Sequence, residues 1–407
     1  AAHINHGSAF SRTSWIILLA VLTAIAPLST DMYLPALPEM ASDFGTSTLL
    51  VSNSLPAYFL GLAIGQLIYG PISDRIGRRT PLIFGLSLHI VASILCIYAD
   101  SLSTLLIVRV LQALGSCVGL VLARAAIRDV LDTAHAAKAF ASMMIVMGIA
   151  PVIAPTLGAW LLIFFRWQSI FVALTALGAV SLIWVLLQFK ETLPAERRLK
   201  LSFMQAGQLY VCIAQDRSFL YPMLAGCFSF GILFCYINAA SAVFMDQYHF
   251  SQQQFAYVFG LNAIGTVLLS SMNHKLEKKY SVAQGLTLGG AVQAFGVFVL
   301  LIAFIFSVFE LPLMLAGLFL AVAGIGLTAP NSTALAMSQQ GRQAGSASAL
   351  MGSLQFGFGL LSGILLNVLL WSAQVNMSLS MLIFVICSNA AIALMQRHLK
   401  SQVILAK

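Results

Sequence analysis

Long apolar stretches alternate with short polar segments along the whole chain. An α-helix rises about 1.5 Å per residue, so about 20 apolar residues are enough to cross the hydrocarbon core of a bilayer. The pattern therefore predicts an all-α integral membrane protein with about twelve transmembrane helices. Their expected ranges are 15–37, 48–70, 81–99, 103–123, 140–163, 168–189, 219–244, 254–273, 282–306, 311–337, 346–370 and 378–396.

The stretch from Lys190 to Arg217 interrupts this pattern because it is rich in charged residues. It divides the apolar stretches into two sets of about six. We therefore expect an N-terminal six-helix bundle (1–189), a cytoplasmic central loop (190–217) and a C-terminal six-helix bundle (218–407), with a pathway between two pseudo-symmetric halves. Within the loop, residues 202–215 fit either a short amphipathic helix on the membrane surface or a flexible linker.

Basic residues are distributed unevenly between the two sides of the predicted helices. If the N-terminus lies inside, all 21 Lys and Arg fall in inner loops except Arg109, which is within a helix, and Arg166, which is in an outer loop. Cytoplasmic loops of membrane proteins carry such an excess. The pattern predicts that both termini are cytoplasmic and that the number of spans is even. The net charge of +8 arises from these loops, so we expect no nucleic-acid partner.

Composition points to lipid as the solvent. The chain is 60% hydrophobic and only 8% charged, with a mean hydropathy of +0.93, whereas soluble domains carry about 25% charged residues. The first apolar stretch is long and no small-residue cleavage pattern follows it, so we expect a retained helix and not a signal peptide. The six cysteines occur singly, which predicts neither a metal site nor a disulfide framework. We expect no cofactor.

One carboxylate lies inside the first apolar stretch. Asp31 precedes Pro38 by seven residues, or ~10 Å, and Arg109 lies ~9 Å from the same face in the antiparallel helix 103–123. They are the only acid and the only base that the predicted helices place well inside a span. Charges in lipid cost about 2.5–3.5 kcal/mol, so they tend to mark ion or substrate pathways. We expect both to share one polar cavity, directly or through water, with Gln112 on the same face as Arg109.

Two structural interpretations of this pair remain open. The first is a fixed ion pair that only holds two helices together. The second is that Asp31 lies so close to the interface that water solvates it, since Pro35 and Pro38 put the end of the helix nearby. How deeply Asp31 is buried decides the second interpretation.

The polar segment after the second predicted helix carries a motif. From Gly70 to Arg79 it reads G-P-I-S-D-R-I-G-R-R, in which the glycines permit a tight turn and Asp74 can pair with an arginine or cap a helix end. The complete pattern G-x-x-x-D-R-x-G-R-R resembles the signature of the major facilitator superfamily. A weaker counterpart, His274 to Lys279, follows the eighth predicted helix.

Further segments resemble one subfamily, the Bcr/CflA-type drug/proton antiporters, which include bicyclomycin-resistance-like exporters. Residues 109–115 resemble the R-x-x-Q-G-x-G element of the superfamily, with Ala113 where glycine is usual. A set of small residues and prolines resembles the fifth-helix antiporter motif and also suits helix packing in any bundle; it comprises Gly148, Pro151, Pro155 and Gly158. The subfamily resemblance is carried by residues 31–38, 191–194, 330–332 and 344–350.

The resemblance implies a role for each motif. Asp31 would be the proton-carrying carboxylate, and Arg109 with Gln112 would modulate it and link protonation to the conformational switch. The loop would form an inner-face latch that holds the outward-open state, through Gly70, Asp74, Arg75, Gly77, Arg78 and Arg79. Some relatives carry a second acid about two helical turns earlier, but residues 22–24 contain none. Antiport of one proton per cycle is therefore the simpler expectation.

The resemblance also implies a function. We expect a proton-coupled antiporter in the inner (cytoplasmic) membrane of a bacterium that exports small amphipathic or hydrophobic compounds, such as antibiotics or a related secreted metabolite. A proton-coupled importer of a small nutrient is the alternative. We expect no enzyme, because no metal cluster, paired membrane acids or activated nucleophile is present, and a passive channel would need no buried acid–base pair. The expected partners are a small-molecule substrate, protons and the lipid bilayer, and we expect a monomer.

The sequence indicates the residues of the substrate cavity less clearly than those of the proton site. Methionine and aromatic walls suit poorly specific binding. For every candidate, ordinary helix packing is at least as good an explanation. The polar candidates are Asn53, Tyr58, Asn238, Asn262, Asn331 and Gln355, and the apolar ones are Met143, Met147, Phe234 and Phe356.

Overall fold

The computed structural model describes residues 12–131, 133–198, 203–276, 278–303, 310–340 and 343–405. Throughout these ranges the regular secondary structure is helical. The described residues contain 12 helical segments that are long and apolar enough to cross a membrane. The all-α architecture with about twelve spans that the sequence predicts is thereby confirmed.

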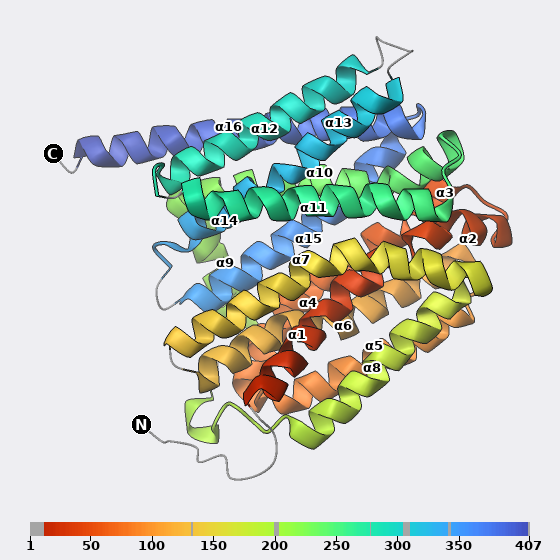
Figure 1. Ribbon diagram of the computed structural model, residues 1–407. Coiled ribbons are helices and arrows are strands. Elements are labelled where there is room, and N and C mark those ends of the chain that lie inside the picture. Colours follow the sequence, from red (N-terminus) through yellow and green to blue (C-terminus); the bar gives the residue numbers. More distant parts are fainter. Residues whose placement is uncertain are drawn as a thin grey trace.

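The spanning helices form two groups, one in the lower and one in the upper part of Figure 1. The first group comprises α1 (Arg12–Asp31), α4 (Ser54–Ile76), α5 (Arg79–Ile97), α6 (Leu102–Val130), α7 (Thr133–Phe164) and α8 (Gln168–Gln188). The second comprises α10 (Arg217–Ser241), α11 (Gln252–Leu276), α12 (Val282–Ile302), α13 (Glu310–Ala323), α14 (Ile325–Met337), α15 (Ala344–Val368) and α16 (Ala373–Leu405). We call these groups the first and the second bundle.

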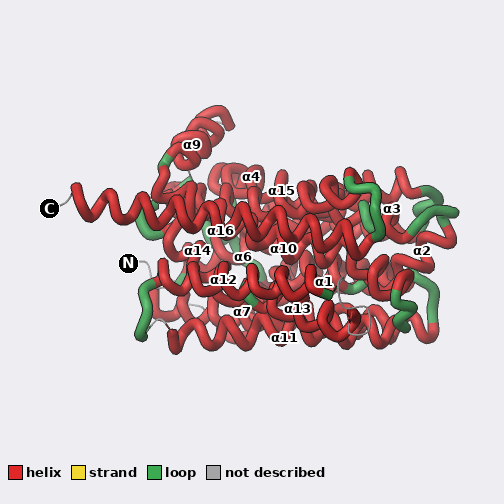
Figure 2. The backbone as a smooth tube through the Cα atoms, turned by 90° about the horizontal axis from the view of Figure 1, so that it is seen from above, coloured by secondary structure: helices red, strands yellow, loops and turns green. Residues whose placement is uncertain are grey.

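Short elements complete the chain. They are η1 (Leu34–Ala36), α2 (Leu37–Asp43), α3 (Thr48–Val51), η2 (Ala195–Arg197), α9 (Phe203–Gln215) and the π-helical turn η3 (Ala242–Gln247). The start of α1 and the end of α16 lie at the same end of the molecule, and α2 and α3 lie at the opposite end (Figures 1 and 2). Which end faces the cytoplasm, and the domain boundaries at 189 and 217, stay predictions.

The first span breaks where the sequence predicted one helix from 15 to 37. Regular α1 ends at Asp31, and the 3-10 turn η1 leads on into α2. Pro35 accounts for the break, because proline has no N–H and its ring disfavours a helical conformation in the residue before it. Asp31 is therefore the last residue of the regular helix.

Glycines bring α6 close to its neighbours. A Cβ atom on Gly119 would overlap the carbonyl oxygen of Leu22 in α1, and one on Gly115 would overlap the backbone nitrogen of His89 in α5. Small residues permit such close packing in membranes, where lipid supplies no hydrophobic force between helices. The helix that carries Arg109 is thus fixed against the helix that carries Asp31.

The central loop forms the helix α9, so of the two alternatives left open by the sequence the helix is correct. Leu209 and Ile213 pack with a hydrophobic cluster of the second bundle. Tyr210 reaches the first bundle, where its Oη donates to the carbonyl oxygen of Leu67 at 3.2 Å. Burial, followed by the nearby Asp74 carboxylate, raises the pKa of Tyr210 to about 12. This helix therefore contacts both bundles at their surface (Figure 2).

We expect Gly119→Ala to lower the thermal unfolding temperature of the purified protein, because the new methyl group has no room beside the Leu22 carbonyl. Overpacking of this kind costs about 1–3 kcal/mol. Gly70→Ala is the matched control, since nothing lies within 4 Å of a Cβ at that position. Equal unfolding temperatures for the two variants would contradict the close contact between α1 and α6.

Candidate functional site

Asp31 is buried at the end of α1. The residue is 4% exposed. None of the described residues forms an ion pair with its carboxylate. This degree of burial does not fit the interpretation in which water at the interface solvates Asp31.

Arg109 is completely buried, with 0% exposure, and its guanidinium group is held from several sides. Nη2 donates to the carbonyl oxygen of Ser29 at 3.0 Å, and Nη1 donates to Oε1 of Gln112 at 2.5 Å. The group also lies over the rings of Tyr33, at 4.4 Å, and Tyr58, at 4.2 Å. Cation–π contacts of this kind are strongest where water is excluded. The Arg109 charge is thus stabilised without a carboxylate.

Asp31 and Arg109 form no ion pair in the described part of the chain, so the fixed ion pair that the sequence left open is not present. Arg109 instead contacts residues two positions before and two positions after Asp31, namely Ser29 and Tyr33. Arg109 therefore holds the last turn of α1 through a backbone carbonyl and the Tyr33 ring, and not through the Asp31 carboxylate.

Asp31 lies near the second bundle. It lies within electrostatic range of the Tyr236 hydroxyl in α10. Tyr236 is 1% exposed and stacks on Phe259 of α11, with ring centroids 5.3 Å apart. Its hydroxyl lies near the Asn262 side chain. Neither Tyr236 Oη nor Asn262 Nδ2 has a hydrogen-bond partner among the described residues. We call these three residues, Asp31, Tyr236 and Asn262, the junction cluster.

Tyr236 was missed from the sequence, although Asn262 was among the candidates for the substrate cavity. A tyrosine in an apolar span is as typical of ordinary packing as of a binding site. Only the approach of α10 to the end of α1 distinguishes it. That approach is fixed by a hydrogen bond from Ser241 Oγ to the carbonyl oxygen of Leu34, 2.8 Å long.

Three more predicted cavity residues lie where the bundles meet. Asn53 and Asn367 of α15 donate hydrogen bonds to each other. Asn367 Nδ2 donates to Asn53 Oδ1 at 2.6 Å, and Asn53 Nδ2 donates to Asn367 Oδ1 at 3.4 Å. Phe234 of α10 packs on Phe59 of α4, with ring centroids 4.5 Å apart, and Phe356 of α15 lies against both rings. These contacts place Asn53, Phe234 and Phe356 at the interface between the bundles.

Three other candidates make contacts within one bundle. Tyr58 bonds to Ser116 at 2.5 Å and faces Arg109, so it belongs to the Arg109 site. Asn238 donates to Ser362 Oγ at 2.8 Å, which joins α10 to α15. Asn331 donates to Asn273 Oδ1 at 2.8 Å, within the second bundle. Met143 is buried, whereas Met147 and Gln355 are half-buried.

The predicted fifth-helix motif lies on α7, which continues through both Pro151 and Pro155. A Cβ on Gly158 would overlap the carbonyl oxygen of Met32, directly after Asp31, and one on Gly148 would lie 3.4 Å from Val267 of the second bundle. The motif therefore packs α7 against the end of α1 and against α11. The structure thus gives the packing explanation direct support, whereas the antiporter role stays a prediction.

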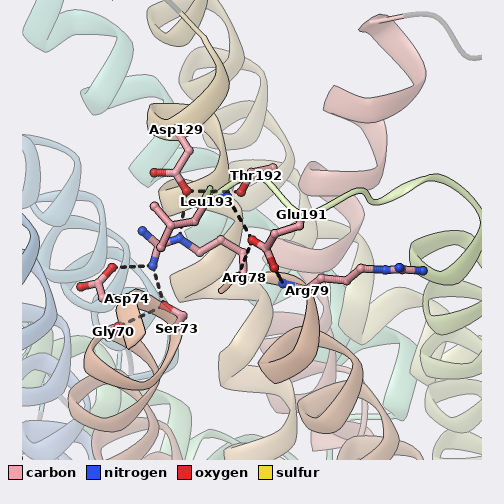
Figure 3. A network of polar contacts seen from close by, with 9 residues as sticks. All are labelled: Gly70, Ser73, Asp74, Arg78, Arg79, Asp129, Glu191, Thr192 and Leu193. Carbon is pink, nitrogen blue, oxygen red and sulfur yellow. Dashed lines mark hydrogen bonds and ion pairs between the residues drawn. The ribbon is translucent and has the colours of Figure 1, made fainter. Parts of the chain in front are cut away.

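The loop between α4 and α5 forms a polar network (Figure 3). The buried Arg78 donates to Asp74 Oδ1 at 2.5 Å, Ser73 Oγ at 2.7 Å and Asp129 Oδ2 at 2.9 Å. Two oppositely charged partners raise the pKa of Arg78 despite the opposing effect of burial. Arg75 is exposed, so it is not part of this network.

Glu191 completes the network from the segment after α8 (Figure 3). Its carboxylate accepts the backbone N–H groups of Arg78 at 2.8 Å, Leu193 at 3.0 Å and Arg79 at 3.2 Å. Gly77, with φ +100°, permits this approach, because a Cβ there would overlap the carboxylate. Burial raises the pKa of Glu191, but the three N–H donors and the Arg198 charge outweigh it, so the net shift is downward.

Asp129 and Glu191 were both missed as partners of the loop. Asp129 ends an apolar span and Glu191 begins the central loop, and an acid in such a place usually faces water. The network joins elements of the first bundle only, as far as the described residues show. Its role as a latch against the second bundle stays a prediction. Among the residues that the structure describes, no cluster of His, Cys, Asp or Glu could hold a metal ion.

We expect Glu191→Gln to lower the unfolding temperature at pH 7 by about 1–3 °C, because a neutral amide accepts the backbone N–H groups less strongly. The folded-state pKa is depressed, so the stabilisation is present above 4.5, the ordinary pKa, and is lost as the pH falls through the folded value. Unfolding curves at pH 7 and at low pH test this. The exposed Glu196→Gln is the control, and a difference from wild type that persists undiminished in acid would contradict the assignment.

The chain was compared with known proteins. Residues 19–364 match the family model described as Major Facilitator Superfamily. The chain is 34% identical over 349 residues to the uncharacterized MFS-type transporter YdgK of Bacillus subtilis, covering 84% of this chain and 86% of that protein. It is 27% identical over 389 residues to a bicyclomycin resistance protein homolog of Haemophilus influenzae, covering 95% and 98%. It is also 30% identical over 261 residues to the multidrug resistance protein MdtL of Klebsiella pneumoniae, covering 63% and 65%.

Solved structures give the same fold. A D-xylose-proton symporter superimposes with a TM-score of 0.72 at 14% identity, covering 94% of this chain and 97% of that one. The nucleoside transporter NupG superimposes with a TM-score of 0.69 at 13% identity, covering 94% and 99%. The family model covers most of the chain, and the structure supplies the two groups of spanning helices. The chain therefore belongs to the Major Facilitator Superfamily of membrane transporters.

Proposed function

We propose that this transporter is a proton-coupled antiporter that exports small amphipathic or hydrophobic compounds across a bacterial inner membrane by alternating access. The observation that carries the proposal is the buried Asp31, which lies where the two bundles meet and has no ionic partner among the described residues. A structural acid would be expected to be paired. An acid that takes up and releases a proton needs a site where its surroundings change.

The mechanism follows from the free energy needed to keep a charged carboxylate where the two bundles meet and exclude water. A charged carboxylate needs hydrogen-bond donors or water, whereas a neutral carboxyl group tolerates apolar surroundings much better. The two protonation states of Asp31 therefore favour different packings of the bundles. The closed junction, with Tyr236 and Asn262 nearby, suits the neutral form, and an opened, hydrated junction suits the charged form. Protons that re-enter supply about 2.3 kcal/mol per charge for each 100 mV.

Arg109 acts in this proposal as a positioning residue. It holds the last turn of α1 through the Ser29 carbonyl and the Tyr33 ring, and so fixes the backbone that carries Asp31. Gln112 supports it and in turn donates to Ser93 Oγ at 2.8 Å. In this proposal, the backbone of α1 links the protonation of Asp31 to the packing of the two bundles at the junction.

The direction of transport is inferred from the relatives. Two of them are named for resistance to bicyclomycin or to many drugs, which is consistent with a Bcr/CflA-type exporter. The aromatic side chains of Phe59, Phe234 and Phe356 at the junction suit amphipathic substrates of varied shape. A monomer without cofactor, driven by the proton gradient alone, remains part of the proposal.

We expect Asp31→Asn to abolish transport driven by a pH gradient in proteoliposomes, because an amide of the same shape cannot carry the proton. The probes are ethidium, tetraphenylphosphonium and bicyclomycin, and the unfolding temperature checks the fold. Asp100→Asn, which removes an exposed acid, is the matched control and should transport like wild type. Full activity of Asp31→Asn would refute the proton role, and uptake in the same direction as the protons would show an importer.

We expect Arg109→Lys to reduce the transport rate by about 10- to 100-fold, as estimated for the loss of one or two charge-assisted hydrogen bonds. Lysine keeps the charge, but it lacks the planar guanidinium group that donates to Ser29 and Gln112 at the same time. Arg166→Lys, at an exposed site paired with Glu39 and Asp43, is the control. If Arg109→Lys transports at the rate of that control, the geometry of the guanidinium group is not needed.

A further inference from the structure

A separate pocket lies at one end of the second bundle. It is enclosed by the first turns of α10 and the last turns of α14 and α16. Three membrane spans have their limits here, because they run from Arg217 to Gln247, from Glu310 to Met337 and from Ala373 to Ser401. The pocket therefore opens at the level where lipid headgroups meet the hydrocarbon core. It is at the opposite end of α10 from the contact with the end of α1.

Polar and apolar residues line this pocket at different depths. Arg217 is the first residue of α10, whereas Pro222 lies five residues, or ~7 Å, further into the span. On α16, His398 lies near the end of the span and Met395 lies one turn deeper. Leu335 of α14 adds to the apolar part. This order matches a phospholipid, whose charged headgroup lies above its apolar chains.

The surroundings of the pocket are basic. Arg217 lines the pocket and is exposed, whereas Arg397 and Lys400 are exposed near His398 on α16 but are not lining residues. The adjacent Asp216, whose carboxylate accepts the Ser218 N–H at 2.9 Å and the Gln340 amide at 3.2 Å, supplies one opposing charge. An anion that enters the pocket therefore meets an excess of positive charge.

The polar side chains of the pocket are held in place. Ser218 Oγ and His398 Nε2 lie 3.3 Å apart, which joins the start of α10 to the end of α16. The His398 ring also stands edge-on to Tyr221, with ring centroids 5.9 Å apart. A fixed imidazole and hydroxyl next to an arginine are suitable hydrogen-bonding partners for a phosphate group.

We propose that this pocket binds the headgroup phosphate of an anionic phospholipid. Arg217 is the ionic partner of the phosphate, and Ser218 and His398 contact its oxygen atoms. The first carbons of the acyl chains pack on Pro222, Leu335 and Met395. Basic pockets between transmembrane helices are known to suit such headgroups. The bound lipid stabilises this end of the second bundle by joining α10 to α16.

The test is a lipid titration of the full-length protein in detergent after lipid removal. Phosphatidylglycerol and the zwitterionic phosphatidylcholine are added in mixed micelles while thermal unfolding is followed. We expect phosphatidylglycerol to raise the unfolding temperature further than phosphatidylcholine does. Arg217→Gln should need about fivefold more phosphatidylglycerol for the same effect. Lys279→Gln removes an exposed cation outside the pocket and should behave like wild type.

Several outcomes would overturn the proposal. One is an equal effect of the two lipids on wild type, and another is an equal loss in Arg217→Gln and Lys279→Gln. Inorganic phosphate forms a further arm: if it stabilises the protein as well as phosphatidylglycerol does, the ligand is a free anion and not a lipid. If Arg217→Gln does not fold, His398→Gln is titrated instead, with the same expected direction.

Discussion

The arrangement of the first bundle depends on one buried charge, the guanidinium group of Arg109. A charge without water needs compensating partners, and here a backbone carbonyl, an amide oxygen and two aromatic rings supply them, whereas Nε has no hydrogen-bond partner among the described residues. The carbonyl belongs to Ser29, so the interaction fixes α6 against the last turn of α1. Gly115 and Gly119 permit the short distance between the helices around α6. The position of the backbone that carries Asp31 is a consequence of this contact.

Arg109 is held without a carboxylate, and Asp31 forms no ion pair among the described residues. The surroundings of Asp31 belong partly to the second bundle, through Tyr236 and Asn262. A change in how the bundles pack therefore changes the surroundings of Asp31 more than those of Arg109. In the proposed mechanism, this separation lets Asp31 respond to the conformation while Arg109, which holds the same turn of α1, keeps its surroundings.

The sequence predicts the spans well because their signal, about 20 apolar residues in a row, is local. It also singles out Asp31 and Arg109, since a charge in an apolar run is conspicuous. It does not predict how they relate, because equal depth in two helices says nothing about rotation around each axis, and Pro35 ends α1 early. Asp129 and Glu191 escape detection for another reason: Glu191 meets Arg78 across 113 positions of the chain, and neither acid is unusual locally.

The described polar bonds between the bundles are few, which bears on how a proton could switch them. At one end of the helices they are the Ser241–Leu34 bond and the Asn53–Asn367 pair, and at the other end Tyr210 of α9 bonds to Leu67. Each neutral hydrogen bond contributes about 0.5–1.5 kcal/mol net. One proton moving through 100 mV releases about 2.3 kcal/mol. At about 1 kcal/mol per bond, one proton therefore supplies enough free energy to break about two such bonds, which is consistent with the proposed one-proton cycle through Asp31.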